Sequence, residues 1–113
     1  MSSYELARVE ESIKQSKEMI TFGKSLDRLL NNPDFKKVIL EDYMQNEAVR
    51  LVKIKADPGM QSLDSQKNIL TQIDAIGTLA QYFQTLKFKV SQAEKALEID
   101  EQTRDEIIEE GLN

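Results

Sequence analysis

An apolar stripe between Ile69 and Leu97 constrains the fold more than any other feature of the sequence. Its positions follow alternating steps of three and four residues, the spacing that keeps one seam of an α-helix against a partner. The stripe consists of Ile69, Gln72, Ile76, Leu79, Phe83, Leu86, Val90, Ala93 and Leu97. Three more apolar residues widen its first half: Leu70, Ile73 and Ala80. The sequence therefore predicts a long helix that begins in a core and narrows to a coiled-coil-like seam.

The composition favours a small all-α protein and removes most of the usual catalytic groups. The 113 residues are 40% hydrophobic and 31% charged, with four Gly and two Pro, a balance typical of one helical domain. The chain has neither Cys nor His, so it lacks thiolates, disulfides and the commonest general base and transition-metal ligand. We expect no catalytic, cofactor or metal site, no enzymatic activity and, without an apolar run of about 18 residues, no membrane span.

Turn and cap residues divide residues 1–97 into three helices. The first is expected over about 4–31. Asn32 caps a second helix, which opens at Pro33 and stops near Ala56, because the Asp-Pro-Gly that follows prevents continuation. Ser62 caps a third helix that runs from residue 63 to 97 or beyond. Residues 98–113 either continue this helix or break from it as an acidic tail or short helix.

Short connections make successive helices antiparallel, so we expect a helical hairpin with a third helix that runs parallel to the first. Counting residues along the three helices places Gly23 and Gly77 at the same height. A glycine inside a helix costs roughly 1 kcal/mol relative to alanine, so each glycine indicates a tight helix contact. The sequence predicts close packing of the first and third helices at Gly23 and Gly77.

The same count predicts that the third helix extends beyond the end of the first. Its last apolar positions would then lack a partner within the chain, and buried-type residues without a partner indicate association. The predicted protein-interaction residues are Phe83, Leu86, Val90, Ala93 and Leu97. The expected partner is a second copy of the chain or another protein.

The charge distribution leaves two alternative functions open. The net charge of −5 comes from residues 64–113, and from residue 98 onward seven acids face one base, so the chain could be a small regulatory protein that binds its partner through an acidic tail. The second predicted helix carries a basic patch suited to a DNA-packaging adaptor: Lys36, Lys37, Arg50, Lys53 and Lys55. Acids in the same segment balance this charge, so nucleic acid is not the expected partner.

Several segments resemble small helical proteins encoded among the head and DNA-packaging genes of tailed bacteriophages. The resemblance rests on residues 22–29 (FGKSLDRL), 32–39 (NPDFKKVI), 47–52 (EAVRLV), 56–58 (ADP) and 73–77 (IDAIG). It implies a virion structural or head-assembly protein, located in the virion and the host cytoplasm, with no catalytic residues to carry over. Such a protein would act through helix-mediated contacts, since virions are built from repeated contacts.

Overall fold

The computed structural model describes residues 2–112, and the side chains of residues 3–111. All regular elements in this range are helical, which confirms the predicted all-α class. The chain forms two compact units, the hairpin unit (residues 27–85) and the terminal unit (residues 2–26 with 86–112). Two helices, α1 (Ser2–Asn31) and α4 (Leu63–Leu112), each contribute residues to both units.

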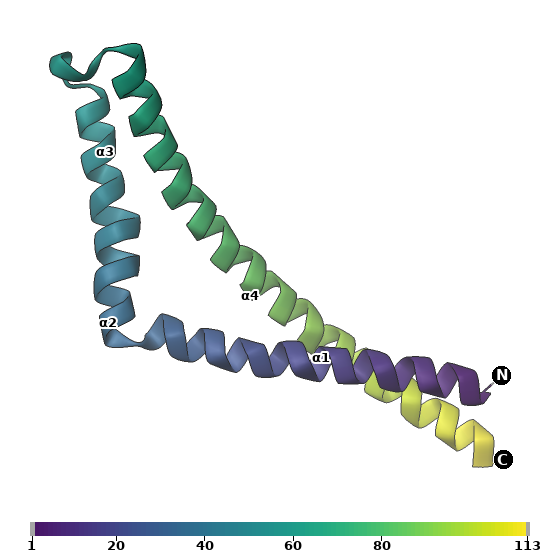
Figure 1. Ribbon diagram of the computed structural model, residues 1–113. Helices are drawn as coiled ribbons and strands as arrows, with labels where there is room; N and C mark the ends of the chain where they lie inside the picture. Colours follow the sequence, from purple (N-terminus) through teal and green to yellow (C-terminus); the bar gives the residue numbers. More distant parts are fainter. Residues whose placement is uncertain (1, 113) are drawn as a thin grey trace. The chain divides into compact units, whose positions relative to one another are not determined.

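The hairpin unit packs a segmented helical arm against the first part of α4 (Figure 1). The arm consists of α2 (Pro33–Phe35), the π-helix η1 (Lys36–Glu47) and α3 (Ala48–Lys55). A single helix over 33–56 was the sequence prediction; its extent is nearly correct, but nothing in the sequence pattern indicates the wider π-helical turns of η1. Leu51, Ile69 and Ile76 form the buried core, and Phe35 packs edge-on against Phe83 with ring centroids 5.9 Å apart.

The first turns of α2 and α4 are capped by two residues that the sequence predicts, Asn32 and Ser62. The side chain of Asn32 accepts hydrogen bonds from the backbone N–H groups of Asp34 and Phe35, both at 3.0 Å. The Ser62 hydroxyl likewise accepts from Ser65 N–H at 3.1 Å, where α4 begins. Between the arm and α4, a 3-10 turn, η2 (Pro58–Met60), is capped by Asp57. Satisfying these free N–H groups fixes where each helix starts.

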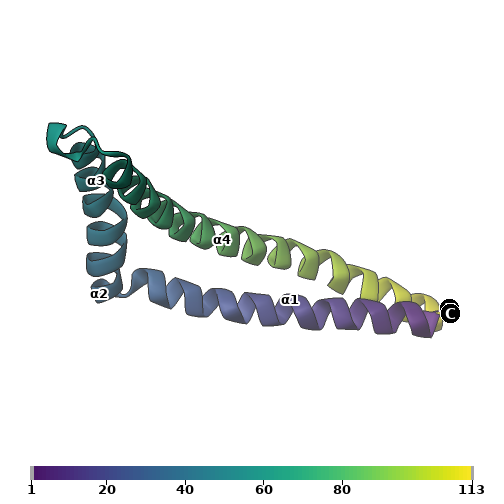
Figure 2. The same ribbon diagram turned by 45° about the horizontal axis from the view of Figure 1, so that its top comes forward.

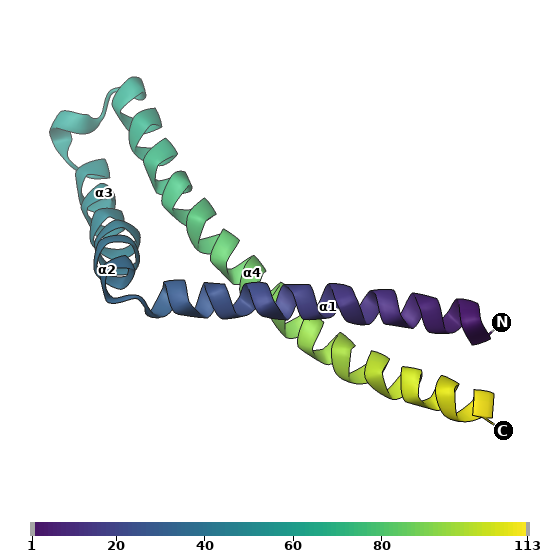
Figure 3. The same cartoon turned by 60° about the horizontal axis from the view of Figure 1, so that its bottom comes forward.

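The terminal unit pairs α1 with the second part of α4 in antiparallel fashion. The Ser12 hydroxyl donates a 2.5 Å hydrogen bond to Asp100 Oδ2, whereas Gly23, eleven residues later in α1, faces Val90, ten residues earlier in α4. The first turns of α1 accordingly lie beside the last turns of α4 in all three ribbon views (Figure 1, Figure 2 and Figure 3). The buried residues of this unit are Ile13, Ser16, Gly23, Leu26, Leu86 and Ala93.

Helix α4 continues without a break through the acidic segment, which settles the choice between a continuous helix and a separate tail. Glu101, Asp105 and Glu109 repeat one turn apart and would repel one another in an isolated helix. The Arg104 guanidinium lies 3.9 Å from the Glu101 carboxylate and 3.5 Å from that of Asp105. This positive charge offsets part of the repulsion, and packing against α1 supplies the rest of the support for the helix.

The predicted parallel arrangement of the first and third helices is wrong. The prediction assumed that all three helices stack side by side from a common end. Instead, the apolar stripe of α4 serves two partners in succession: its first part packs against the arm in the hairpin unit, and its second part packs against α1 in the terminal unit. A stripe of nine positions can supply both contacts because α4 is 50 residues long.

Candidate interaction surfaces

The apolar positions of α4 that were predicted to lack a partner within the chain are in fact covered by other parts of the chain. Leu86 and Ala93 are each only 8% exposed, and Val90 and Leu97 are half-buried. In the terminal unit Val90 packs on Gly23 of α1. Phe83 belongs to the hairpin unit, where Phe35 contacts it. The expectation that these positions lack an intrachain partner is therefore wrong, because α1 and the arm reach them.

The two glycines predicted to pack together have different surroundings. Gly23 is buried, and a Cβ there would come within 2.7 Å of Val90 Cγ1, so the predicted tight packing exists at Gly23 with a different neighbour. Gly77 is exposed, and a Cβ there would meet no atom of residues 2–112 within 4 Å beyond its own helix. The predicted close contact at Gly77 is therefore wrong within the chain, because the side of α4 that carries it faces solvent.

One side of the hairpin unit carries a row of exposed apolar side chains, which we call the hairpin face. Val52, Leu70 and Gly77 each directly follow a core residue, and in an antiparallel helix pair the positions that follow the core residues lie on the same side. Leu63 precedes Leu70 by two turns and is 90% exposed. The hairpin face comprises Val49, Val52, Leu63, Leu70 and Gly77, with its four side chains 45–90% exposed.

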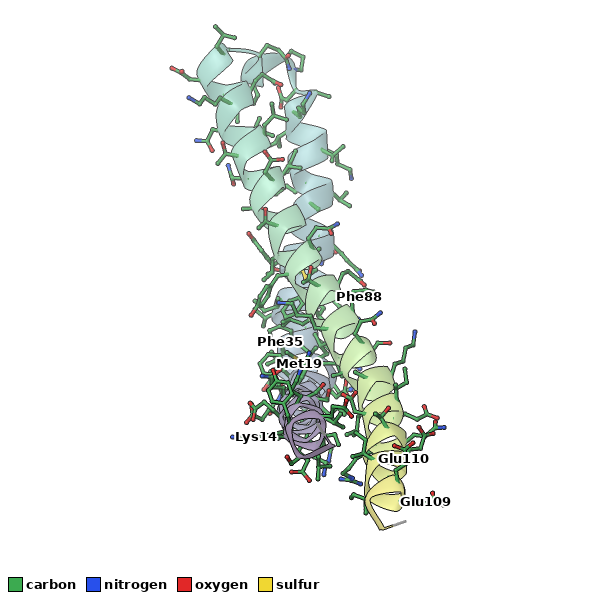
Figure 4. The ribbon with its side chains drawn as sticks, turned by 90° about the vertical axis from the view of Figure 1, so that its right-hand side faces the viewer. Lys14, Met19, Phe35, Phe88, Glu109 and Glu110 are labelled. Atoms are coloured by element: carbon green, nitrogen blue, oxygen red, sulfur yellow. The ribbon has the colours of Figure 1, made fainter. Side chains whose placement is uncertain are left out.

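A second apolar surface lies along the terminal unit, in a groove of about 340 Å³ between α1 and α4. Met19 of α1 and Phe88 of α4, both labelled in Figure 4, line it together with Ala96 of α4. Phe88 is 63% exposed, and Ile99, three turns further along the same side of α4, is 64% exposed. The polar lining residues, among them Gln15 and Lys89, make this groove more mixed in character than the hairpin face.

The charged candidates form solvated surfaces. All five residues of the basic patch are exposed, and one of them is paired, because the Arg50 guanidinium donates to the Glu47 carboxylate with Nε 2.9 Å from Oε2. This bond lowers the pKa of Glu47 below its ordinary value of 4.5 and raises the pKa of Arg50. In the acidic segment, Asp105, Glu106, Glu109 and Glu110 are exposed on the last turns of α4.

No cluster of three or more His, Cys, Asp or Glu side chains that could bind a metal occurs among residues 2–112. Four acids could in principle share a bundle interior: Glu41, Asp42 and Glu47 on η1 and Asp74 on α4. Glu41, Asp42 and Asp74 are exposed, and Glu47 is half-buried and pairs with Arg50. None of the helices between residues 2 and 112 combines the length and apolar character needed to cross a bilayer.

Sequence reasoning assigned two hairpin-face residues, Leu70 and Val52, to the core. Leu70 widens the stripe of α4, and Val52 continues the apolar pattern of the second helix, so both were expected to be buried. The available signal was the seven-residue spacing of Leu63, Leu70 and Gly77, which marks a second row beside the core row. A two-helix unit buries one row per helix, and the second row is left outside.

No family model matches the chain, and no curated protein or solved structure is significantly similar to it. The surfaces described above are therefore the basis for assigning a function.

Proposed function

We propose that this chain is a non-enzymatic structural or assembly protein of a bacteriophage head, which acts through helix-mediated protein contacts. One observation supports the proposal above the others: the hairpin face exposes a row of apolar side chains, with Leu63 at 90%, and the terminal unit exposes Phe88 at 63% and Ile99 at 64% on one side of α4. Single exposed apolar residues are common on protein surfaces, whereas rows of them mark protein interaction sites.

The thinness of the units supports the same proposal. Helices gain most of their stability from packing an apolar face, and a pair of helices buries only one face of each. Within the described range, the buried apolar side chains are Ile13, Leu26, Leu51, Ile69, Ile76, Leu86 and Ala93. A protein with so small a core gains stability by contact with further subunits, as a component of a repeated assembly does. The resemblance to phage head and packaging proteins supplies the setting, in virion and host cytoplasm.

The proposal is tested in the phage that encodes the chain. Mass spectrometry of purified particles and of head-assembly intermediates should detect the protein, and a stop codon in its gene should reduce the yield of complete particles. Detection in intermediates alone would identify an assembly factor, and detection in particles a permanent component. Absence from both, together with normal particle yield from the stop-codon phage, would contradict the proposal.

The regulatory alternative has a separate test, because four acids are exposed on the last turns of α4. A complex held by these charges should weaken steeply between low and high salt, since exposed charges are screened beyond about 8 Å at physiological ionic strength. A complex held by the apolar rows should be nearly insensitive to salt. Salt titration of complexes recovered from phage-infected cells therefore separates the two mechanisms.

A further inference from the structure

We propose that the hairpin face binds a second copy of the chain, with the two α4 helices antiparallel about a two-fold axis beside Leu70. This inference rests on the proposed function, since it names one of the contacts through which such a protein would assemble. Three features of α4 support it: an exposed glycine, an exposed leucine at the matching distance, and two opposite charges that form no ion pair with any residue the structure describes.

The glycine leaves a hollow in the helix surface. Gly77 lies inside α4, where glycine is unfavourable relative to alanine, and no atom of the described residues fills the space where its Cβ would be. Packing within the chain therefore does not require a glycine at this position. The missing side chain exposes the backbone of α4 to close approach by a group from another molecule.

The protruding group is available in the same row. Leu63 is 90% exposed and lies seven residues before Leu70, while Gly77 lies seven residues after it. A two-fold axis beside Leu70 pairs positions that are equally distant from it in opposite directions. Leu63 of each copy would then lie over the partner's Gly77, and the two Leu70 side chains would meet at the axis.

The charges on this row are complementary in the same register. Lys67 precedes Leu70 by three residues and Asp74 follows it by four, so Lys67 would lie within one residue, about 1.5 Å along the axis, of the partner's Asp74. Both side chains are exposed, and neither makes an ion pair with another residue in the described part of the chain. The axis would form this contact twice.

The self-matching pattern favours a second copy over an unrelated partner. In a two-fold contact the same patch must supply both halves of every interaction. The row Leu63–Gly77 does so, because Leu63 and Gly77 lie at equal distances from Leu70, and the distances of Lys67 and Asp74 from it differ by one residue. Val49 and Val52 of α3 lie on the same side and would extend the apolar contact beyond the α4 pair.

The first test fills the hollow. In the full chain, Gly77→Gln replaces a poor helix former with a good one, and its Cβ would meet no atom of the described residues within 4 Å, so thermal stability measured at low protein concentration should not fall. Sedimentation equilibrium should show that self-association weakens at least about tenfold, because the new side chain occupies the site of Leu63. Gly111→Gln is the matched control: Gly111 is also exposed in α4, and a Cβ there would meet no atom of the described residues within 4 Å, so this variant should associate like the wild type.

The second test exchanges the charges. Lys67→Asp and Asp74→Lys should each weaken self-association, since each places like charges opposite one another. The double variant should restore it. Rescue would have to come from contact between copies, because residues seven apart on one helix do not reach each other as residues three or four apart do.

Each outcome supports or overturns the inference. A wild-type chain that remains monomeric overturns it, as does association that Gly77→Gln leaves unchanged, or a double charge variant that behaves no better than the single ones. If these tests contradict self-association, the proposed function still holds provided that the protein is found in phage particles. Another protein would then cover the hairpin face. Conversely, a dimer with these properties, absent from particles and dispensable for their assembly, would contradict the proposed function while upholding the self-contact.

Discussion

At the scale of single residues, the clearest constraint is the contact between Gly23 and Val90. A Cβ at residue 23 would lie 2.7 Å from Val90 Cγ1 and 2.9 Å from Cγ2, closer than carbon atoms pack. Valine is stiff at χ1 and cannot turn both methyl groups away inside a helix. Glycine at this position therefore allows α1 and α4 to approach each other, which outweighs its low helix propensity.

We predict that Gly23→Ala destabilises the protein despite alanine's higher helix propensity. Overpacking costs about 1–3 kcal/mol against a propensity gain of roughly 1 kcal/mol, so the net loss of unfolding free energy should be up to about 2 kcal/mol. Urea unfolding measures it. Adding Val90→Ala should recover part of the loss in the double variant, so that the two changes are non-additive. Strictly additive losses would mean that these residues do not touch.

The pair Glu47 and Arg50 gives a prediction in pH. The hydrogen bond from Arg50 lowers the pKa of Glu47, so its stabilisation is fully present above the ordinary pKa of 4.5 and is lost as pH falls through the lowered value. In Arg50→Gln the pKa of Glu47 should return toward its ordinary value, as followed by NMR titration of the Glu47 carboxyl carbon. Lys53→Gln, a nearby exposed change, should leave it lowered. An unchanged pKa in Arg50→Gln would exclude this cause.

At the scale of elements, the sequence specifies where helices begin better than what they contact. Asn32, Pro33 and Ser62 predict two helix starts because capping is a local interaction between a side chain and nearby N–H groups. The π-helical hydrogen bonding of η1 has no such local signal. The end of α4 could not be predicted either, since the acids after residue 98 disfavour a helix that packing against α1 supports.

We predict that the core of the hairpin unit depends on Leu51 far more than on its neighbour in sequence. Leu51 is fully buried, whereas Val52 is 62% exposed. Leu51→Ala should lower the free energy of unfolding by about 2–4 kcal/mol, because it removes buried methyl groups and leaves a cavity. Val52→Ala should change it by less than about 0.5 kcal/mol. Comparable effects of the two changes in urea unfolding would mean that α3 is rotated relative to the arrangement described here.

At the scale of the whole molecule, sequence reasoning identified the apolar stripe of α4 but misassigned its partner. The residue count assumed one stack of three helices, so it placed Val90, Ala93 and Leu97 beyond the end of the first helix. In fact α1 pairs with residues 86–112 of α4. Sequence periodicity shows which face of a helix is apolar, but it does not show which helix covers that face.

This limit of sequence periodicity also explains why the predicted interaction surface was the apolar seam of α4, whereas the exposed apolar surface is the hairpin face. Leu63 and Leu70 have the same chemistry as the core residues beside them, and only the pairing of the arm with α4 shows that Ile69 faces inward and Leu70 outward. The expectation of association through apolar residues on α4 remains a prediction, now attached to a different row.

The most direct test of association is the molar mass of the full chain in solution, measured by light scattering over a dilution series. We predict a mass of twice 13.0 kDa at high concentration that falls toward the monomer value on dilution and changes little with salt. A mass of 13.0 kDa at every concentration would contradict self-association through the hairpin face.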